Sequence, residues 1–194
     1  MCGRYLFSQE ADEPAMQRLL DLAHRQGLAL PDGDIAPGSL APTLVNGPIK
    51  AELKFMQWGF PLADSGRLIH NARSESAGEK RMFARCLQHG RCVIPTTGFY
   101  EWSHGQEARQ YRFNLPGEQM LYLAGLYDIF EDVPRFVVLT CPAVGQVSAI
   151  HHRQPVVLRR SELLLWLRDR QAAMELLRHE GLPLQGRTVD WEED

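Results

Sequence analysis

Apolar residues recur at helical spacing in several stretches of the chain. In residues 12–25 they fall three and four apart, as at Met16, Leu19 and Ala23, until Gly27 ends the pattern. Residues 79–87 repeat this spacing more weakly. Two further helical stretches follow near the other end, at 162–169 with Ser161 as the expected N-cap and at 171–181. The pattern predicts three or four surface helices.

The middle of the chain alternates short apolar or aromatic runs with turn formers, which is typical of β-strands. These runs cover residues 40–46, 51–60, 91–95, 99–103, 109–115, 120–130 and 134–141. Residues 30–42 are dense in proline and glycine and predict an irregular loop. Because strands outnumber helices and short loops join most of them, we expect a curved, mainly antiparallel α+β domain.

Composition narrows the class of protein. With 194 residues, 44% of them hydrophobic and 23% charged, the chain fits one globular domain spanning 1–194. It contains no apolar run of about 20 residues and no secretory leader, so we expect a cytoplasmic monomer without a membrane segment. A net charge of −3 argues against nonspecific coating of nucleic acid, although a local basic groove is compatible with it.

The four cysteines form no CxxC pair, so we expect neither a disulfide nor a metal site, and no cofactor. Three of them, Cys86, Cys92 and Cys141, lie in apolar surroundings and are expected in the core. The fourth, Cys2, follows the initiator methionine directly. Removal of Met1 would leave a thiol with a pKa near ~8.5 beside an α-amine with a pKa near ~8.

This aminothiol is suited to capturing an aldehyde. The amine forms a Schiff base, and the thiol then closes a five-membered thiazolidine that resists water better than the imine does. The alternative is a cysteine that merely follows the initiator methionine.

Two aromatic or basic motifs carry candidate acid/base groups. Alternation places Glu101 of GFYEW on the same face as Phe99, which favours an apolar pocket and a raised pKa, although an exposed strand glutamate fits the spacing equally well. His151 and His152 begin HHRQP. On an extended segment neighbouring side chains point to opposite faces, so only one of the two would face a site, which argues against a shared metal. An imidazole without a catalytic role is the alternative for either residue.

The segment NARSE supplies polar groups that suit a nucleotide. If it is extended, Asn71 and Arg73 face the same way, and their amide and guanidinium groups suit a sugar oxygen and a phosphate.

Taken in order, MCGR, APG at 36–38, WG at 58–59, NARSE, GFYEW and IHHRQP resemble the SOS response-associated peptidase (SRAP) family. Its members crosslink to abasic sites in single-stranded DNA, and the resemblance covers about residues 2–158. It implies a barrel-like core of curved sheets with peripheral helices. It also implies that the mature cysteine forms a thiazolidine with the ring-opened abasic deoxyribose. An autoproteolytic peptidase activity that releases whatever precedes this cysteine is implied as well, and a lyase activity is compatible with the family.

The resemblance assigns roles residue by residue. Cys2 is the nucleophile, and Glu101 is the acid/base that opens the sugar hemiacetal and transfers protons during imine formation. His151, which follows Ile150 as the family's IH pair requires, protonates the leaving oxygen and assists reversal. Asn71 orients the sugar or the Cys2 amine. The DNA-binding positions that the resemblance implies are Gly3, Arg4, Arg73, Glu75, Trp102 and Thr140.

Three departures from the family pattern change the expected DNA contacts. The WG motif continues as FPLADSGRL, which offers only Phe60 and Leu62 for stacking on bases. Asp34 stands where the family favours asparagine. The chain ends in WEED soon after its last helix, so we expect the family's C-terminal strand to be missing or altered. Phosphate contacts from Arg4 and Arg73 should then carry most of the affinity.

Two other functions fit the same residues. The protein could be a thiol peptidase or amidohydrolase with Cys2 as N-terminal nucleophile and His151 or Glu101 as base. It could also be a noncatalytic single-strand-binding module in which Arg4, Arg73 and Trp102 hold DNA. A heat-stable adduct with abasic single-stranded DNA would separate the crosslinking hypothesis from both.

Overall fold

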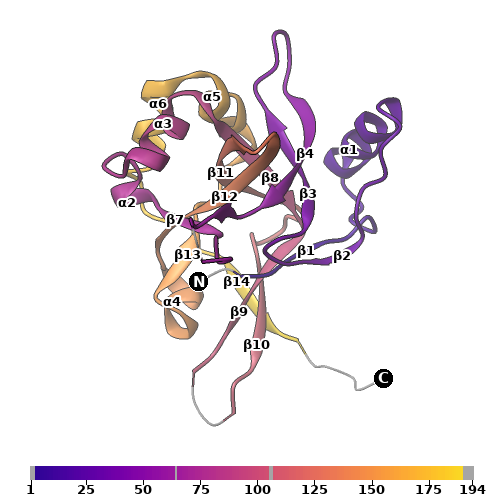
Figure 1. Cartoon of the computed structure of the whole chain (residues 1–194). Helices are drawn as coiled ribbons and strands as arrows, with labels where there is room; N and C mark the ends of the chain where they lie inside the picture. Colours follow the sequence, from indigo (N-terminus) through magenta and orange to yellow (C-terminus); the bar gives the residue numbers. More distant parts are fainter. Residues whose placement is uncertain (1–2, 64, 105–106, 190–194) are drawn as a thin grey trace.

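A closed ring of strands forms the centre of the computed structural model, which describes residues 3–63, 65–104 and 107–189. Neighbours in the ring are hydrogen-bonded in the order β11 (Leu121–Phe130), β8 (Arg91–Thr96), β3 (Leu40–Val45), β4 (Glu52–Trp58) and β12 (Val133–Pro142). The ring closes because β12 also pairs with β11 (Figure 1). The β4–β12 pairing is parallel and the others are antiparallel. This arrangement confirms the mainly antiparallel, barrel-like α+β fold.

A second, open antiparallel sheet leans on the ring. Its order is β14 (Gln185–Thr188), β10 (Gln110–Asn114), β9 (Gly98–Trp102), β1 (Tyr5–Phe7) and β2 (Gly33–Ile35). The chain passes from β8 in the ring to β9 in this sheet through a short corner. There the buried Thr96 hydroxyl donates to the Leu6 carbonyl (2.5 Å) and accepts from the Gly98 N–H (3.2 Å). The corner fixes the direction in which β9 leaves the barrel.

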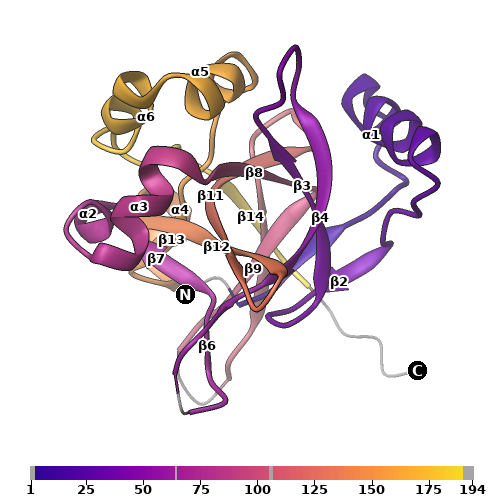
Figure 2. The ribbon, with the colours of Figure 1, turned by 45° about the horizontal axis from the view of Figure 1, so that its top comes forward.

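Short elements extend the ring and cover its sides. β7 (Asn71–Arg73) and β13 (Arg153–Pro155) both pair with β12, and β5 (Phe60–Pro61) pairs with β6 (Leu68–Ile69). Helix α1 (Pro14–Arg25) lies on the opposite side of the barrel from the other helices (Figures 1 and 2). Those helices are α2 (Ser74–Ala77), α3 (Arg81–His89), α4 (Gly145–Ile150), α5 (Leu163–Arg168) and α6 (Arg170–Leu176), with a 3₁₀ turn at Arg160–Glu162.

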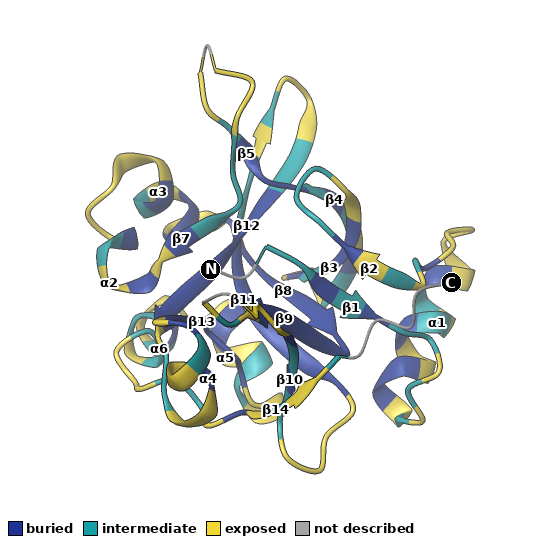
Figure 3. Ribbon diagram, turned by 90° about the horizontal axis from the view of Figure 1, so that it is seen from below, coloured by how far each residue is buried: buried dark blue, intermediate teal, exposed yellow. Residues whose placement is uncertain are grey.

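The core lies between the two sheets and inside the ring, where the strands are buried while most hairpin tips are exposed (Figure 3). Cys86, Cys92 and Cys141 are buried thiols, as the sequence predicts. Burial raises the pKa of Cys86 to about 12 and that of Cys141 to about 11, so both stay protonated at neutral pH. No helix among the described residues has the length and apolarity needed to cross a bilayer.

Helix α1 is the element that the sequence pattern predicts best. Its apolar face buries Met16, Leu19 and Ala23. Gly27, with a φ of +67°, ends the helix in the left-handed region that glycine adopts without strain. The Gly27 N–H donates to His24 O and the Leu28 N–H to Ala23 O, both at 3.0 Å. These bonds satisfy carbonyls that the last helical turn leaves open.

Several local predictions are wrong. Ser161 lies inside the 3₁₀ turn rather than capping α5, and the side-chain cap belongs to Asp169, which accepts from Ala172 N (3.0 Å) at the start of α6. The expected strand over 51–60 breaks at Gly59. That residue has a φ of +113°, and a Cβ there would stand 2.9 Å from Leu68 Cβ.

Two further corrections concern strands that pairing partners stabilise. The expected loop over 30–42 contains β2, which is paired with β1 through Asp34 and Leu6. A C-terminal strand is present as β14, which pairs with β10 from Gln185 to Thr188. Both are short polar segments whose strand conformation depends on a neighbour and not on their own apolar pattern.

A buried arginine joins two helix ends. Arg91 is only 7% exposed, and its guanidinium donates to Leu87 O (2.7 Å) and Gln88 O (3.3 Å) at the end of α3. It also donates to Trp166 O (2.6 Å) and Leu167 O (3.1 Å) in α5. The positive charge therefore lies against the negative ends of two helices and satisfies four carbonyls.

We predict that Arg91→Met lowers the free energy of unfolding by roughly 2–4 kcal/mol, because these carbonyls lose their donors while staying buried. Urea denaturation of both proteins measures the change. Arg170→Met, at an exposed position of α6, is the control and should change stability by less than about 0.5 kcal/mol. Equal effects of the two substitutions would show that the Arg91 hydrogen bonds contribute little.

Candidate active site

Glu101 lies on the buried face of β9. It pairs across the strands with Tyr111 and shares its face with Phe99, as alternation predicts. The residue is 3% exposed, and burial raises the pKa of its carboxyl from 4.5 to about 7. A carboxyl that titrates near neutral pH can both donate and accept a proton under physiological conditions.

His151 approaches this carboxyl from the end of helix α4. The backbone N–H of His151 donates to Val147 O (2.8 Å), and the ring atom Nδ1 lies 4.0 Å from Glu101 Oε1. The residue is 9% exposed, and burial lowers the pKa of the imidazole. Burial thus disfavours the charged form of both groups, so near pH 7 a protonated carboxyl lies beside a neutral imidazole, an arrangement suited to proton transfer.

The backbone of Arg153 holds the His151 ring. The Arg153 N–H donates to Nδ1 (3.0 Å), and the Arg153 carbonyl lies 3.1 Å from the same atom. A neutral ring can accept from the N–H, and a ring protonated at Nδ1 can donate to the carbonyl. The imidazole therefore has a partner in either protonation state.

The rings of His151 and His152 lie 4.4 Å apart, although the His151 backbone, which follows α4, is extended with a φ of −147° and a ψ of 146°. Burial still separates them, since His152 is exposed. The His104 ring lies 5.9 Å from His151. Over the residues that the structure describes, no group of three or more histidine, cysteine or acidic side chains could hold a metal.

A second cluster centres on the Arg153 side chain, which is buried. Its guanidinium donates to both carboxylate oxygens of Glu75, with Nη2 2.8 Å from Oε2, and to the Thr140 carbonyl (2.5 Å). This hydrogen-bonded pairing lowers the pKa of Glu75 to about 2. Arg153 therefore connects two residues that the sequence named, Glu75 and Thr140, with the His151 ring. Sequence reasoning missed this role, and the available signal was an arginine directly before the apolar run QPVVL.

Asn71 and Arg73 share a face of β7, as the sequence predicts. Ala72 between them is buried, while Asn71 is half-buried and Arg73 is exposed. The strand runs parallel to β12, with Asn71 beside Val138 and Arg73 beside Thr140. This pairing sets Arg73 next to the Arg153 cluster.

The remaining predicted positions lie at the surface. Arg4 Nη1 is 3.2 Å from Asp34 Oδ2, so the residue that departs from the family pattern is the partner of a predicted DNA-binding arginine. Trp102 is 38% exposed at the end of β9, and Gly3 is half-buried. Cys2 lies outside the described residues.

Phe60 is not available for base stacking, contrary to the sequence expectation. It is fully buried, and its ring centroid lies 4.8 Å from that of Phe130 and 6.2 Å from that of Phe83. Leu62 is 44% exposed.

The chain belongs to the SOS response associated peptidase (SRAP) family, whose model matches residues 1–192. It is 27% identical to the abasic site processing protein YobE of Bacillus subtilis, over 94% of this chain and 89% of that protein. It is also 27% identical to the abasic site processing protein YedK of Escherichia coli, over 90% of this chain and 83% of that protein.

Solved structures share the fold. A Bordetella bronchiseptica protein superposes with a TM-score of 0.77 at 19% identity, covering 98% of this chain and 100% of that one. A Bacteroides thetaiotaomicron protein superposes with a TM-score of 0.75 at 20% identity, covering 97% and 92%.

The raised pKa of Glu101 predicts a pH dependence of stability. The folded protein holds this proton more tightly than the unfolded chain does, so stability falls as the pH rises from about 4.5 to 7 and is constant above that range. Glu101→Gln removes this loss. Between pH 4.5 and 8 the variant should gain up to about 3 kcal/mol relative to the wild type.

Urea denaturation across this pH range measures the difference. Glu107→Gln is the matched control, because Glu107 has a side chain that is 83% exposed in the same hairpin. A pH-independent difference between Glu101→Gln and wild type would contradict the raised pKa.

Proposed function

We propose that the protein is a sensor and covalent trap of abasic sites in single-stranded DNA. The observation that carries the proposal is the buried pair of Glu101 and His151, 4.0 Å apart, in a member of a family whose named relatives process abasic sites. Burial raises the pKa of Glu101 to about 7, so its carboxyl can donate and accept protons near neutral pH, and burial favours the neutral form of the His151 imidazole. In this proposal the protein acts as a single-domain monomer in the cytoplasm.

The chemistry needs no oxidant and no cofactor. After Met1 is removed, the Cys2 amine attacks C1′ of the ring-opened deoxyribose to give a carbinolamine. Loss of water then gives an imine, and the Cys2 sulfur adds to the imine carbon while its proton passes to the nitrogen. One water leaves in total, and the product is a thiazolidine.

The buried pair supplies the proton transfers. Glu101, protonated near neutral pH, donates a proton as the sugar hemiacetal opens and regains one during imine formation. His151 protonates the leaving oxygen, and the same step in reverse releases the DNA. Asn71 orients the sugar or the amine. The pair would also serve the autoproteolysis that exposes Cys2 when a segment precedes it, and a lyase step through the imine.

The surrounding residues would hold the strand. We assign DNA contacts to Gly3, Arg4, Arg73, Glu75, Trp102 and Thr140. Glu75 and Thr140 act through Arg153, because its guanidinium bonds both of them. The pairing compensates the Glu75 carboxylate, which would otherwise repel a phosphate near Arg73.

We predict that Cys2→Ala abolishes the heat-stable adduct with an abasic single-stranded oligonucleotide on a denaturing gel. The new N-terminal amine can still form an imine, so borohydride should trap a weak product. A protein that retains Met1 should give neither product, because the nitrogen of Cys2 is then a peptide amide, which cannot form an imine, and the free α-amine belongs to Met1. Cys86→Ala, which removes a buried thiol, is the control and should keep the adduct. Undiminished heat-stable adduct from Cys2→Ala would exclude this cysteine.

We further predict that Glu101→Gln and His151→Ala each slow crosslinking by roughly 10²-fold or more, with little change in affinity for undamaged single strands. Single-turnover rates on abasic DNA and anisotropy with undamaged DNA measure the two effects separately. The wild-type rate should also depend on pH near 7, and Glu101→Gln should flatten that profile. Equal losses of rate and affinity would instead identify these residues as positioning groups.

A further inference from the structure

Two arginines stand side by side on the outer face of the open sheet. Across the strands Arg112 of β10 faces Tyr100 of β9 on one side and Arg187 of β14 on the other. Directly opposite residues of antiparallel strands have Cβ atoms about 5 Å apart. This face is the reverse of the one that carries Phe99 and Glu101, so the arginines are outside the proposed catalytic pair.

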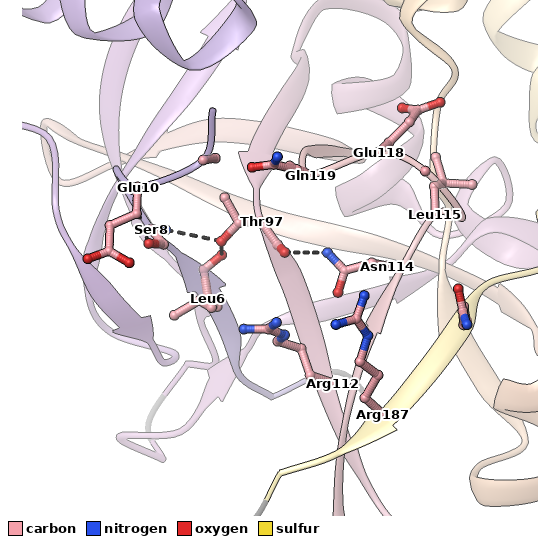
Figure 4. Close-up of a pocket in the computed structure, with 13 residues that line it drawn as sticks. Leu6, Ser8, Glu10, Thr97, Arg112, Asn114, Leu115, Glu118, Gln119 and Arg187 are labelled. Atoms are coloured by element: carbon pink, nitrogen blue, oxygen red, sulfur yellow. Dashed lines mark hydrogen bonds between the residues drawn. The ribbon is translucent and has the colours of Figure 1, made fainter. Parts of the chain in front are cut away.

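A cavity of about 500 Å³ opens beside these arginines (Figure 4). Its floor is fixed by hydrogen bonds, since the Thr97 hydroxyl accepts from Ser8 N (3.0 Å) and the Asn114 amide donates to the Thr97 carbonyl. Arg112 and Arg187 lie together at one end. Two carboxylates also line the cavity, Glu118 on the side away from the arginines and Glu10 at the left in Figure 4.

The positive charge at this end is not compensated by the parts of the protein that the structure describes. No salt bridge or side-chain hydrogen bond within residues 3–63, 65–104 and 107–189 involves Arg112 or Arg187. Like charges directly opposite on neighbouring strands repel each other. An anion bound between the two guanidinium forks would remove the repulsion and accept several charge-assisted hydrogen bonds.

The arginine pair continues a polar row that begins at Arg4. The Tyr100 N–H donates to Arg4 O (3.0 Å), so Arg4, Tyr100, Arg112 and Arg187 follow one another across adjacent strands. With strands about 4.8 Å apart, the row extends roughly 15 Å from Arg4, a few nucleotides of extended single strand. Arg4 lies two residues after Cys2 in the chain.

We infer that this outer face binds the backbone of the single strand that flanks the lesion, with Arg112 and Arg187 gripping one phosphate group in the cavity. The identity of the ligand as DNA rests on the proposed function, whereas the anion site rests on the arginine pair alone. Neither arginine belongs to the motifs that carry the family resemblance.

The test measures affinity for undamaged oligothymidylate by anisotropy over a range of salt concentrations. Arg112→Gln and Arg187→Gln should each weaken binding about three- to tenfold at low salt and lower the log–log salt slope by about 0.7. Lys50→Gln is the control, because Lys50 is exposed in the β3–β4 hairpin, at the opposite end of the molecule in Figure 1. It should change neither quantity.

Undamaged DNA cannot react with Cys2, so this result is independent of crosslinking. If the arginine variants lower the salt slope but the wild type forms no adduct with abasic DNA, the DNA-binding surface is supported and the proposed covalent function is rejected. A second arm measures thermal stabilisation by inorganic phosphate. If phosphate stabilises the wild type but not the two variants, while their DNA affinity is unchanged, the site binds free phosphate and the DNA assignment is wrong. If the variants match Lys50→Gln in both arms, the anion site is wrong as well.

Discussion

Arg153 is buried in β13, which pairs with β12, and its side chain and main chain bond different parts of the candidate site. The guanidinium bonds Glu75 and the Thr140 carbonyl, and the backbone bonds His151 Nδ1. A buried guanidinium is costly unless its charge is paired and its donors are used, so the ion pair with Glu75 stabilises Arg153 in its buried position. Because the pairing fixes β13 against β12, it also fixes the histidine ring.

The electrostatics of the site follow from this arrangement. Arg153 is compensated by Glu75, so little uncompensated positive charge from it reaches the neighbouring pair. Glu101 and His151 therefore respond mainly to burial, which raises the pKa of the acid and lowers that of the base. Under the proposed function, a carboxyl whose pKa is raised to about 7 suits a group that donates and regains a proton.

Sequence reasoning succeeded where the pattern is local and repeated. The apolar face of α1 and the long strands β11 and β12 have enough residues to show their period, and the alternation of GFYEW placed Glu101 beside Phe99. It failed where conformation depends on a distant partner. Strands β2, β7 and β13 have three residues each, too few to show a period, and they form because β1 and β12 offer hydrogen bonds.

Dependence on partners that are distant in the sequence also explains which parts of the candidate site could be predicted. Ordered motifs identified Asn71, Glu101 and His151 as candidates, but no local pattern reveals that Arg153 lies between Glu75 and His151. Those contacts join positions 78 residues apart in the chain. The close approach of the His151 and His152 rings was not predicted either, because strand alternation gives the directions of side chains and not the distance between their rings.

Two departures from the family pattern, Asp34 and the residues after the WG motif, affect how the open sheet and its surroundings could contact DNA. Asp34 holds Arg4 in an ion pair, and both side chains are partly exposed, so a phosphate at Arg4 must compete with a carboxylate. The burial of Phe60 removes one candidate for stacking on a base. Under the proposed function, both features would weaken contact with the DNA near Arg4. Arg112 and Arg187, two and three strands from Arg4 and without a carboxylate bonded to them in the described chain, add positive charge farther along the same face. In the proposed complex these cationic contacts lie away from the reacting sugar, so a salt-sensitive grip on the DNA backbone would leave lesion selectivity to the covalent step.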